Sequence, residues 1–234
     1  MKNKILVFNM KMYMDIDEVY KYIDKVDNYD NVVMCPESIY IPYFLRKYKN
    51  IGVQMIYPSD MGAYTGNISA YHAKKMGVKY AIVGHSECRC FFHISDSDVN
   101  EKIKSCIKND IIPIMCIGES LKDKKLGNTK KIIKKQLEDG LKDIKCDKII
   151  IAYEPIYAIG SGYVPTNTDI IDVISYIKNI LEGKNIDAHI LYGGSVSSKN
   201  IKDLSKIDII DGFMIGKSCT VVNEVEKMMK LLSS

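Results

Sequence analysis

The sequence has no run of about 18 uninterrupted apolar residues, the length that a helix needs to cross a bilayer. A membrane-spanning protein is therefore not expected. The chain also lacks a dense face of lysine and arginine interleaved with aromatic residues, which argues against a nucleic-acid-binding protein. Its net charge of +4 is modest and suits an anionic small-molecule substrate.

The seven cysteines include no Cys-x-x-Cys pair and are scattered along the chain. This pattern argues against a disulfide framework or a zinc site, and it favours reduced thiols in a cytosolic protein. The first residues lead directly into an apolar run, so no signal peptide is expected and a cytoplasmic location is predicted. Cys88 lies three residues after His85, which raises a reactive thiol as the alternative to an ordinary small buried cysteine.

Short apolar runs and amphipathic segments alternate along the whole chain, and hydrophobic residues make up 47% of it, enough for a substantial core. Eight runs are predicted as strands: 5–9, 32–35, 51–54, 80–83, 111–116, 149–153, 190–192 and 212–215. Helices are predicted between them over 16–26, 69–76, 97–109, 128–144, 170–181 and 222–232, with shorter ones at 43–48 and 200–205.

Eight strand–helix units without a linker predict one closed (β/α)8 barrel, a single domain over residues 1–234. A doubly wound open sheet is the alternative class of fold. It is disfavoured because no Gly-x-Gly-x-x-Gly motif follows the first strand. Asp15 and Glu18 are placed to cap the first helix.

Polar side chains follow several of the predicted strands at their carboxyl ends. Asn9 and Lys11 follow the first strand, where strand alternation predicts that they share a face. His85 follows the fourth strand, Glu154 the sixth and Ser195 the seventh. Because α/β proteins bind ligands at the carboxyl ends of their strands, these groups are predicted to meet at one site. Three of these residues also have a purely structural interpretation. Glu154 could cap the next helix, Lys11 could be an ordinary surface lysine, and His85 could be a histidine whose hydrogen bonds are all made within the core.

Seven segments resemble signatures of the triosephosphate isomerase family. They are Asn9-Met10-Lys11, Gly62-Ala63-Tyr64-Thr65-Gly66, Gly84-His85-Ser86-Glu87, Cys116-Ile117-Gly118-Glu119, Tyr153 to Gly162, Tyr192-Gly193-Gly194-Ser195 and Asp211 to Gly216. Each segment alone is weakly specific, but their joint order across residues 5–218 is very specific. The resemblance implies a TIM barrel and a cofactor-free isomerase that interconverts dihydroxyacetone phosphate and glyceraldehyde 3-phosphate.

The resemblance also implies roles for individual side chains. Glu154 is the base and a neutral His85 hydrogen-bonds the substrate oxygens, a division of roles already described for triosephosphate isomerase itself. Lys11 supplies positive charge, Asn9 hydrogen-bonds the substrate and helps to position His85, and Glu87 is a neighbour of Lys11 rather than a second base. Apolar cover strengthens a carboxylate as a base, and two further side chains supply that cover: Ile159 and Met214.

Phosphate is assigned to backbone amides that follow the last three strands. The residues concerned are Gly160, Gly193, Gly194, Ser195, Gly216 and Lys217. For any one of these glycines, an ordinary turn is the structural alternative. Gly160 belongs to the loop 155–165, which the resemblance identifies as a lid that closes over Glu154.

The lid departs from the family pattern at both of its ends. The family has a tryptophan where this chain has Tyr157, and no tryptophan is present anywhere in the sequence. The far hinge, usually Lys-Thr-Ala, is Tyr163-Val164-Pro165. In the family, the counterpart of Tyr192 bonds an amide of that hinge, and Pro165 has no amide hydrogen to give. Lys217 replaces the second glycine of the usual pair after the last strand.

The loop 55–69 resembles the family's dimerisation loop, which implies a homodimer in which Thr65 reaches the partner's active site. Met55 replaces the usual asparagine of this loop. The usual glutamate–arginine pair across the interface is replaced at both positions, by Asn67 and Cys88, so no orphaned charge is left behind. A monomer with an exposed loop is the alternative.

Two other functions compete with the isomerase reading. One is a different phosphate-binding barrel enzyme that acts on a related sugar phosphate, which the lid signature disfavours. The other is a catalytically weak or dead paralogue that serves as a phosphometabolite-binding or scaffold protein. That alternative predicts the loss of a catalytic side chain, yet all four are present: Asn9, Lys11, His85 and Glu154. No metal or cofactor is predicted.

Overall fold

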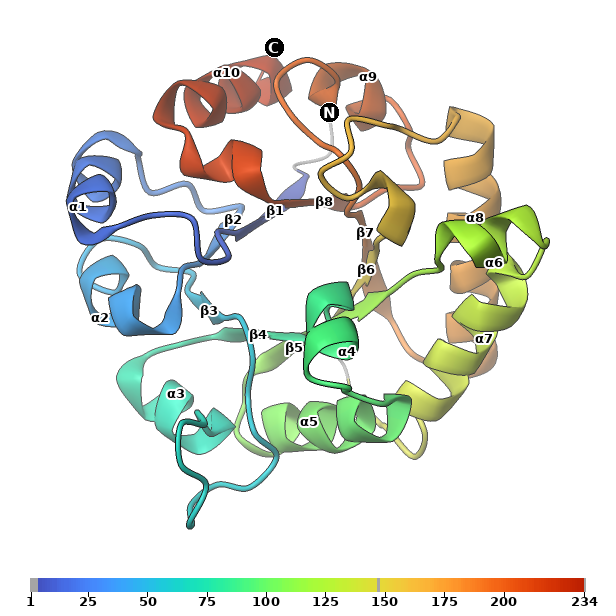
Figure 1. Cartoon of the computed structure of the whole chain (residues 1–234), viewed down its shortest axis with the longest axis horizontal. Coiled ribbons are helices and arrows are strands. Elements are labelled where there is room, and N and C mark those ends of the chain that lie inside the picture. The colour runs from blue at the N-terminus through green and yellow to red at the C-terminus, as the bar shows by residue number, and fades with distance from the viewer. Residues whose placement is uncertain (1–3, 147, 234) are drawn as a thin grey trace.

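Eight parallel strands form a barrel surrounded by helices in the computed structural model, which describes residues 4–146 and 148–233 (Figure 1). The strands are β1 (Ile5–Asn9), β2 (Val32–Cys35), β3 (Gly52–Val53), β4 (Tyr80–Val83), β5 (Ile112–Ile117), β6 (Ile149–Tyr153), β7 (Ala188–Tyr192) and β8 (Gly212–Ile215). Their order is β2-β1-β8-β7-β6-β5-β4-β3, and one parallel bridge between Met34 and Ile51 joins β2 to β3. The predicted (β/α)8 barrel is confirmed.

Helices alternate with the strands and cover the outside of the barrel. The α-helices are α1 (Ile16–Lys25), α2 (Ile41–Phe44), α3 (Ala70–Met76), α4 (Ser86–Phe91), α5 (Asp96–Lys108), α6 (Leu121–Lys125), α7 (Thr129–Gly140), α8 (Asn167–Gly183), α9 (Ile201–Ser205) and α10 (Val222–Ser233). Short 3-10 helices are η1 (Ser38–Tyr40), η2 (Ile156–Ala158) and η3 (Lys217–Thr220). The predicted cap of α1 is confirmed, since Asp15 and Glu18 exchange side-chain-to-backbone hydrogen bonds.

The structure differs from the predicted elements mainly where segments are short. The strand predicted over 51–54 shrinks to Gly52–Val53, and the helix predicted over 43–48 lies earlier because Pro42 opens it. The helix predicted over 128–144 ends at Gly140, and Asp143 then takes a left-handed φ of 58°. The helix α6 was not predicted, because five residues are too few to show helical periodicity.

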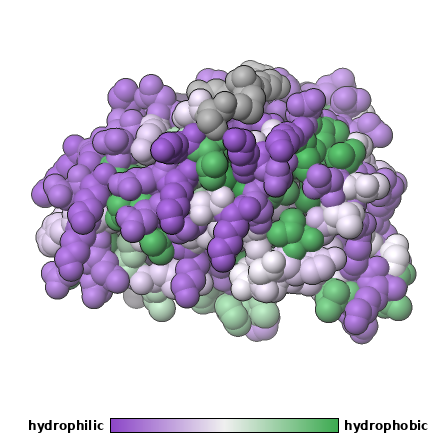
Figure 2. All heavy atoms as spheres, turned by 90° about the horizontal axis from the view of Figure 1, so that it is seen from above, coloured by the Kyte–Doolittle hydropathy of each residue, from purple (hydrophilic) through white to green (hydrophobic). Residues whose placement is uncertain are grey.

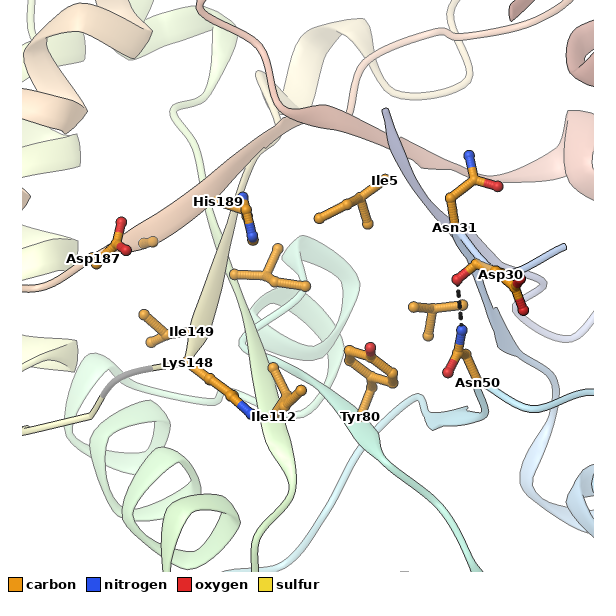
Figure 3. A pocket seen from close by; sticks show the side chains of 13 residues that line it. Ile5, Asp30, Asn31, Asn50, Tyr80, Ile112, Lys148, Ile149, Asp187 and His189 are labelled. Carbon is orange, nitrogen blue, oxygen red and sulfur yellow. Dashed lines mark hydrogen bonds between the residues drawn. The ribbon is translucent and has the colours of Figure 1, made fainter. Parts of the chain in front are cut away.

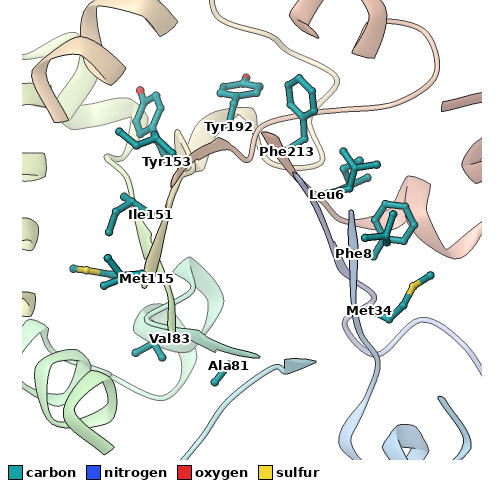
Figure 4. Packing of buried hydrophobic residues seen from close by; sticks show 14 of the residues in the cluster. Leu6, Phe8, Met34, Ala81, Val83, Met115, Ile151, Tyr153, Tyr192 and Phe213 are labelled. Atoms are coloured by element: carbon teal, nitrogen blue, oxygen red, sulfur yellow. The ribbon is translucent and has the colours of Figure 1, made fainter. Parts of the chain in front are cut away.

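Side chains alternate along each strand and produce two apolar layers. Outward-facing residues pack between the strands and the helices, as Figure 4 shows for Leu6, Phe8, Ile151, Tyr153 and Tyr192. Inward-facing residues fill the barrel and include Val7, Val33, Ile82, Ile114, Ile150, Ala152 and Leu191. Each fully buried aliphatic side chain contributes roughly 1.5–3 kcal/mol, so these layers make the barrel a rigid support for its ends.

The side of the molecule seen in Figure 2 carries mainly hydrophilic side chains, with apolar ones in separate patches. This distribution is typical of helices that bury one face against a sheet. Among the residues that the structure describes, no helix combines the length and the apolarity that a membrane crossing requires.

Candidate functional site

A cavity of about 840 Å³ opens at the carboxyl ends of the strands. It brings together twelve of the predicted site residues: Asn9, Lys11, His85, Glu154, Ile159, Gly160, Gly193, Gly194, Ser195, Met214, Gly216 and Lys217. Glu87 lies in the neighbouring groove, and Thr65 lies on the exposed loop after β3. Residues from distant parts of the sequence therefore meet where the strand pattern predicts.

A smaller cavity of about 270 Å³ lies at the opposite end, where the strands begin (Figure 3). Its apolar wall includes Ile5, Tyr80 and Ile112, and Lys148 and His189 also line it. None of the predicted site residues lines this cavity. His189 precedes Leu191 by two residues on β7, so the same alternation that fills the barrel places this histidine far from the candidate site.

Glu154 and His85 face each other inside the larger cavity. Glu154 follows β6, is only 4% exposed, and its Oε1 lies 3.5 Å from His85 Nε2. The other carboxylate oxygen, Oε2, is buried and has no hydrogen-bond partner in the described part of the chain. Gly193 makes room for this side chain, because a Cβ there would lie 2.6 Å from Glu154 Cγ.

His85 caps the short helix α4 and is only 4% exposed. Its Nδ1 accepts a hydrogen bond of 3.3 Å from the backbone N–H of Glu87, so in the neutral ring the proton lies on Nε2, toward Glu154. Burial lowers the pKa of His85, but the carboxylates of Glu154 and Glu87 outweigh burial and raise it above its ordinary value. The resemblance implies a neutral His85. A molecule that lies between His85 and Glu154 would favour that neutral form, because it would weaken the contact that raises the pKa.

Lys11 lines the cavity, but it lies in a turn and not on the strand from which side-chain alternation predicted its position. The strand β1 ends at Asn9, and Lys11 lies in a turn with a left-handed φ of 51°. Asn9 Oδ1 accepts from the backbone N–H of Lys11 at 3.3 Å, and Lys11 Nζ lies 2.6 Å from Glu87 Oε1. A positive φ at a residue other than glycine is uncommon and is often found at functional sites.

Gln54 is a supporting residue that the sequence analysis missed. Its side-chain amide donates to the carbonyl oxygens of Lys11 at 2.9 Å and of Cys35 at 3.0 Å. These bonds hold the strained turn of Lys11 against the ends of β2 and β3. The only signal in the sequence was a polar side chain directly after a short apolar strand.

Unpartnered backbone amides line the other end of the cavity. The N–H groups of Gly160, Gly194, Ser195 and Lys217 donate to no acceptor within residues 4–146 and 148–233. The N–H of Gly193 differs, because it donates to Tyr153 O at 2.8 Å. Gly216 follows β8 and leads into η3, which precedes α10. Free amides beside a lysine form an environment suited to an anion.

Ser195 joins the lid to the barrel. Its hydroxyl donates to Ala158 O at 2.6 Å and accepts from the N–H of Gly162 at 3.1 Å, so it holds both arms of the lid. The hydroxyl of Tyr192 is buried and has no hydrogen-bond partner among the described residues. This agrees with the predicted loss of its hinge partner at Pro165.

Cys88 does not have the features of a reactive thiol. Burial and the neighbouring Glu87 carboxylate raise the pKa of Cys88, which keeps the thiol protonated. Protonated thiols are weak nucleophiles, so the ordinary small cysteine is the better interpretation of this residue.

Comparison with known proteins agrees with this arrangement. A family model described as "Triosephosphate isomerase" matches residues 4–232. The chain belongs to the triosephosphate isomerase family. It is 35% identical to the triosephosphate isomerase of Clostridium tetani, with 96% of this chain and 94% of the relative covered. It is 36% identical to the triosephosphate isomerase of Mycoplasmopsis pulmonis, with 100% of this chain and 98% of the relative covered. It is 41% identical to the triosephosphate isomerase of Mesomycoplasma hyorhinis, with 77% of this chain and 73% of the relative covered.

Proposed function

We propose that this chain is a cofactor-free triosephosphate isomerase, which interconverts dihydroxyacetone phosphate and D-glyceraldehyde 3-phosphate. The observation that carries the proposal is the orphaned oxygen of Glu154 in a cavity that also holds Lys11 and unpartnered amides. Buried polar atoms without a partner are rare and call for a reason. A small substrate with an acidic C–H at one end and a phosphate at the other satisfies both ends of the cavity.

Glu154 is the base in the proposed reaction. It removes a proton from the carbon next to the carbonyl, and the electron pair of that C–H bond moves toward the carbonyl oxygen to give an enediolate. A proton passes by way of His85 from the hydroxyl oxygen on the deprotonated carbon to the oxygen that gained charge, and the same carboxyl group then returns its proton to the former carbonyl carbon. The Nε2–H of His85 donates to the oxygen that gains charge, and the ammonium of Lys11 stabilises the negative charge. Asn9 supplies a further hydrogen bond to the substrate.

The substrate itself favours the neutral form of His85. The contact with Glu154 is a main cause of the raised pKa of this histidine, and burial acts in the opposite direction. A substrate placed between the two side chains weakens that contact, so burial and the N–H of Glu87 on Nδ1 then favour the neutral ring. A neutral imidazole with its proton on Nε2 is suited to hydrogen-bond the developing oxyanion.

The phosphate is proposed to lie among the amides of Gly160, Gly194, Ser195 and Lys217. Gly160 contributes from the lid, where its left-handed φ of 65° suits a glycine. Lid closure therefore completes the phosphate site and shields the enediolate from water. Gly193 contributes space for Glu154, since its own N–H is already bonded.

The proposed function is tested by a coupled assay of the purified protein with glyceraldehyde 3-phosphate. Turnover that disappears in Glu154→Gln supports it and excludes a contaminating isomerase. A protein without turnover that still binds phosphate analogues would instead support the scaffold alternative. No observation in the structure favours that alternative, because the four implied catalytic side chains all line one cavity.

We further propose a homodimer that is formed through the loop 55–69. This loop projects beyond the ring of helices (Figure 1), and its exposed side chains include Met61, Tyr64 and Thr65. Next to the catalytic cavity lies a groove of about 360 Å³ that shares Asn9, Lys11 and His85 with it. Exposed apolar residues on the rim of this groove are Met12, Phe91 and Phe92. Apolar surface of this kind fits burial against a second copy of the loop.

Replacing Thr65 with arginine is expected to weaken both assembly and activity. A charge buried without a partner costs several kcal/mol, so the dissociation constant of the dimer should rise by on the order of 10²-fold. Sedimentation velocity and the dependence of specific activity on enzyme concentration measure the two effects. The matched control is Asn223→Arg, which adds the same charge at an exposed position of α10. An active parent protein that sediments as a monomer would refute the dimer.

Ser195→Ala is expected to reduce activity more than Tyr192→Phe. The alanine removes two hydrogen bonds to the lid, each worth about 0.5–1.5 kcal/mol, so the closing equilibrium should fall by roughly tenfold or more. The phenylalanine removes a hydroxyl that has no partner among the described residues, so its effect should stay within about twofold. Both are measured as kcat/KM in one assay. A larger loss in Tyr192→Phe would mean that this hydroxyl has another role in closure.

A further inference from the structure

The two arms of the lid contact each other through a pair of tyrosine rings. Tyr157 lies in η2 on the first arm and Tyr163 on the second, with ring centroids 5.9 Å apart and ring planes inclined by 51°. Between them, Gly160 and Gly162 take left-handed φ values of 65° and 77°, which turn the chain back on itself. The separation of the rings is within the range in which aromatic pairs stabilise proteins.

A third tyrosine, Tyr192, makes no side-chain hydrogen bond to the lid within the described part of the chain. Its hydroxyl is buried without a partner among the described residues, and the hinge residue that the resemblance implies as its partner is Pro165, which has no N–H. Burial raises the pKa of Tyr192, and the phenols of Tyr157 and Tyr163 raise it further. An aromatic pair and a neutral hydrogen bond stabilise proteins by similar amounts, so the first is able to replace the second.

We propose that Tyr163 is a positioning residue: its ring packs on Tyr157 and holds the lid closed, in place of a hydrogen bond from Tyr192, whose hydroxyl has no partner among the described residues. Tyr157 is the fixed member of the pair, because it is partly buried and lies close to Glu119. The carboxylate of Glu119 in turn accepts hydrogen bonds from the hydroxyls of Tyr153 and Thr129. Tyr163 is 54% exposed, so its ring is free to leave when the lid opens.

The proposal is tested first by amide hydrogen exchange at Gly162, followed by NMR without any ligand. The N–H of Gly162 donates to Ser195 Oγ at 3.1 Å, so its exchange reports how often the lid opens. Tyr163→Leu should accelerate this exchange roughly two- to tenfold, the factor that one aromatic pair contributes to such an equilibrium. Tyr163→Phe keeps the ring and should exchange at the parental rate.

A second readout rests on the proposed function. An enediolate exposed by an open lid breaks its C–O bond to phosphate. The phosphate leaves with the electron pair of that bond, and the enol left behind moves its hydroxyl proton to carbon to give methylglyoxal. Tyr163→Leu should therefore raise the phosphate released per isomerisation by roughly the same two- to tenfold as the exchange rate. Tyr157→Leu should raise the phosphate released per isomerisation in the same way. Because both substitutions remove the same ring contact, the double variant should release no more phosphate than the more damaging single variant.

Three results would overturn the proposal. They are parental exchange at Gly162 in a folded Tyr163→Leu protein, equal acceleration in Tyr163→Phe, and additive effects of the two leucine substitutions. A circular dichroism melt confirms folding in each case. Accelerated exchange in Tyr163→Leu, with no isomerase activity in the parent, would support the tyrosine pair while refuting the proposed function.

Discussion

Glu154→Gln is expected to fold normally and to lose almost all isomerase activity. The loss should exceed that of Glu154→Asp, for which a reduction on the order of 10²–10³-fold is expected. Glutamine has the shape of glutamate and fits the space that Gly193 leaves, but its amide cannot accept a carbon-bound proton. Aspartate keeps the base and withdraws it by about 1 Å, a shift that is costly in catalysis. The comparison is made as kcat and kcat/KM in the coupled assay.

Glu119→Gln is the matched control for this experiment. Glu119 is also a buried carboxylate with one oxygen that lacks a hydrogen-bond partner among the described residues, but it does not line the catalytic cavity. Glutamine keeps a carbonyl oxygen that accepts from the hydroxyls of Tyr153 and Thr129, so it is an acceptable replacement there. We expect Glu119→Gln to lower turnover far less than Glu154→Gln does. Near-parental turnover in Glu154→Gln would show that another group is the base.

Lys11→Met is expected to abolish turnover together with tight binding of 2-phosphoglycolate, an anion that resembles the enediolate. The ammonium of Lys11 is only partly exposed, and its loss removes a fixed positive charge from the site where negative charge develops. Isothermal titration calorimetry measures the binding and the coupled assay measures the turnover. The substitution leaves Glu87 without its partner, but the side chain of Glu87 is 44% exposed and remains hydrated, so the fold should survive.

Lys217→Met provides the comparison for that variant. Lys217 lines the same cavity, but it is exposed and is proposed to bind phosphate through its backbone amide, which methionine retains. Its loss should weaken 2-phosphoglycolate binding much less than the loss of Lys11. Parental affinity in Lys11→Met would show that this side chain points away from the bound anion.

The positions of Glu154 and Met214 were predictable because they depend on strand alternation. The inward residues of β6 are Ile150 and Ala152, and continuing the pattern by two places Glu154 at the barrel mouth. Met214 lies inside the barrel by the same rule. The fold was predictable for a related reason, since eight apolar runs at regular spacing leave few arrangements that bury them all.

Other features depend on contacts that no local pattern reveals. The turn at Lys11 breaks the strand period, and the hydrogen bond that supports it comes from Gln54, more than forty positions away. Gly193 is one example. Its N–H is bonded to Tyr153 of the neighbouring strand β6, so this glycine leaves room for Glu154 but offers no free amide to a ligand. The ring contact of Tyr163 needs the lid to turn back on itself, which two glycines permit but do not require.

The barrel has a weak seam between β2 and β3. Neighbouring strands elsewhere share at least two residue pairs, whereas this junction has one bridge, between Met34 and Ile51. Gln54 reinforces the seam from the side, by bonding across to Cys35 and to Lys11 at once. Local unfolding is therefore expected to begin here, and a thermal fluctuation that parts these two strands also frees the turn that carries Lys11. Loss of catalysis on heating should then precede loss of the barrel.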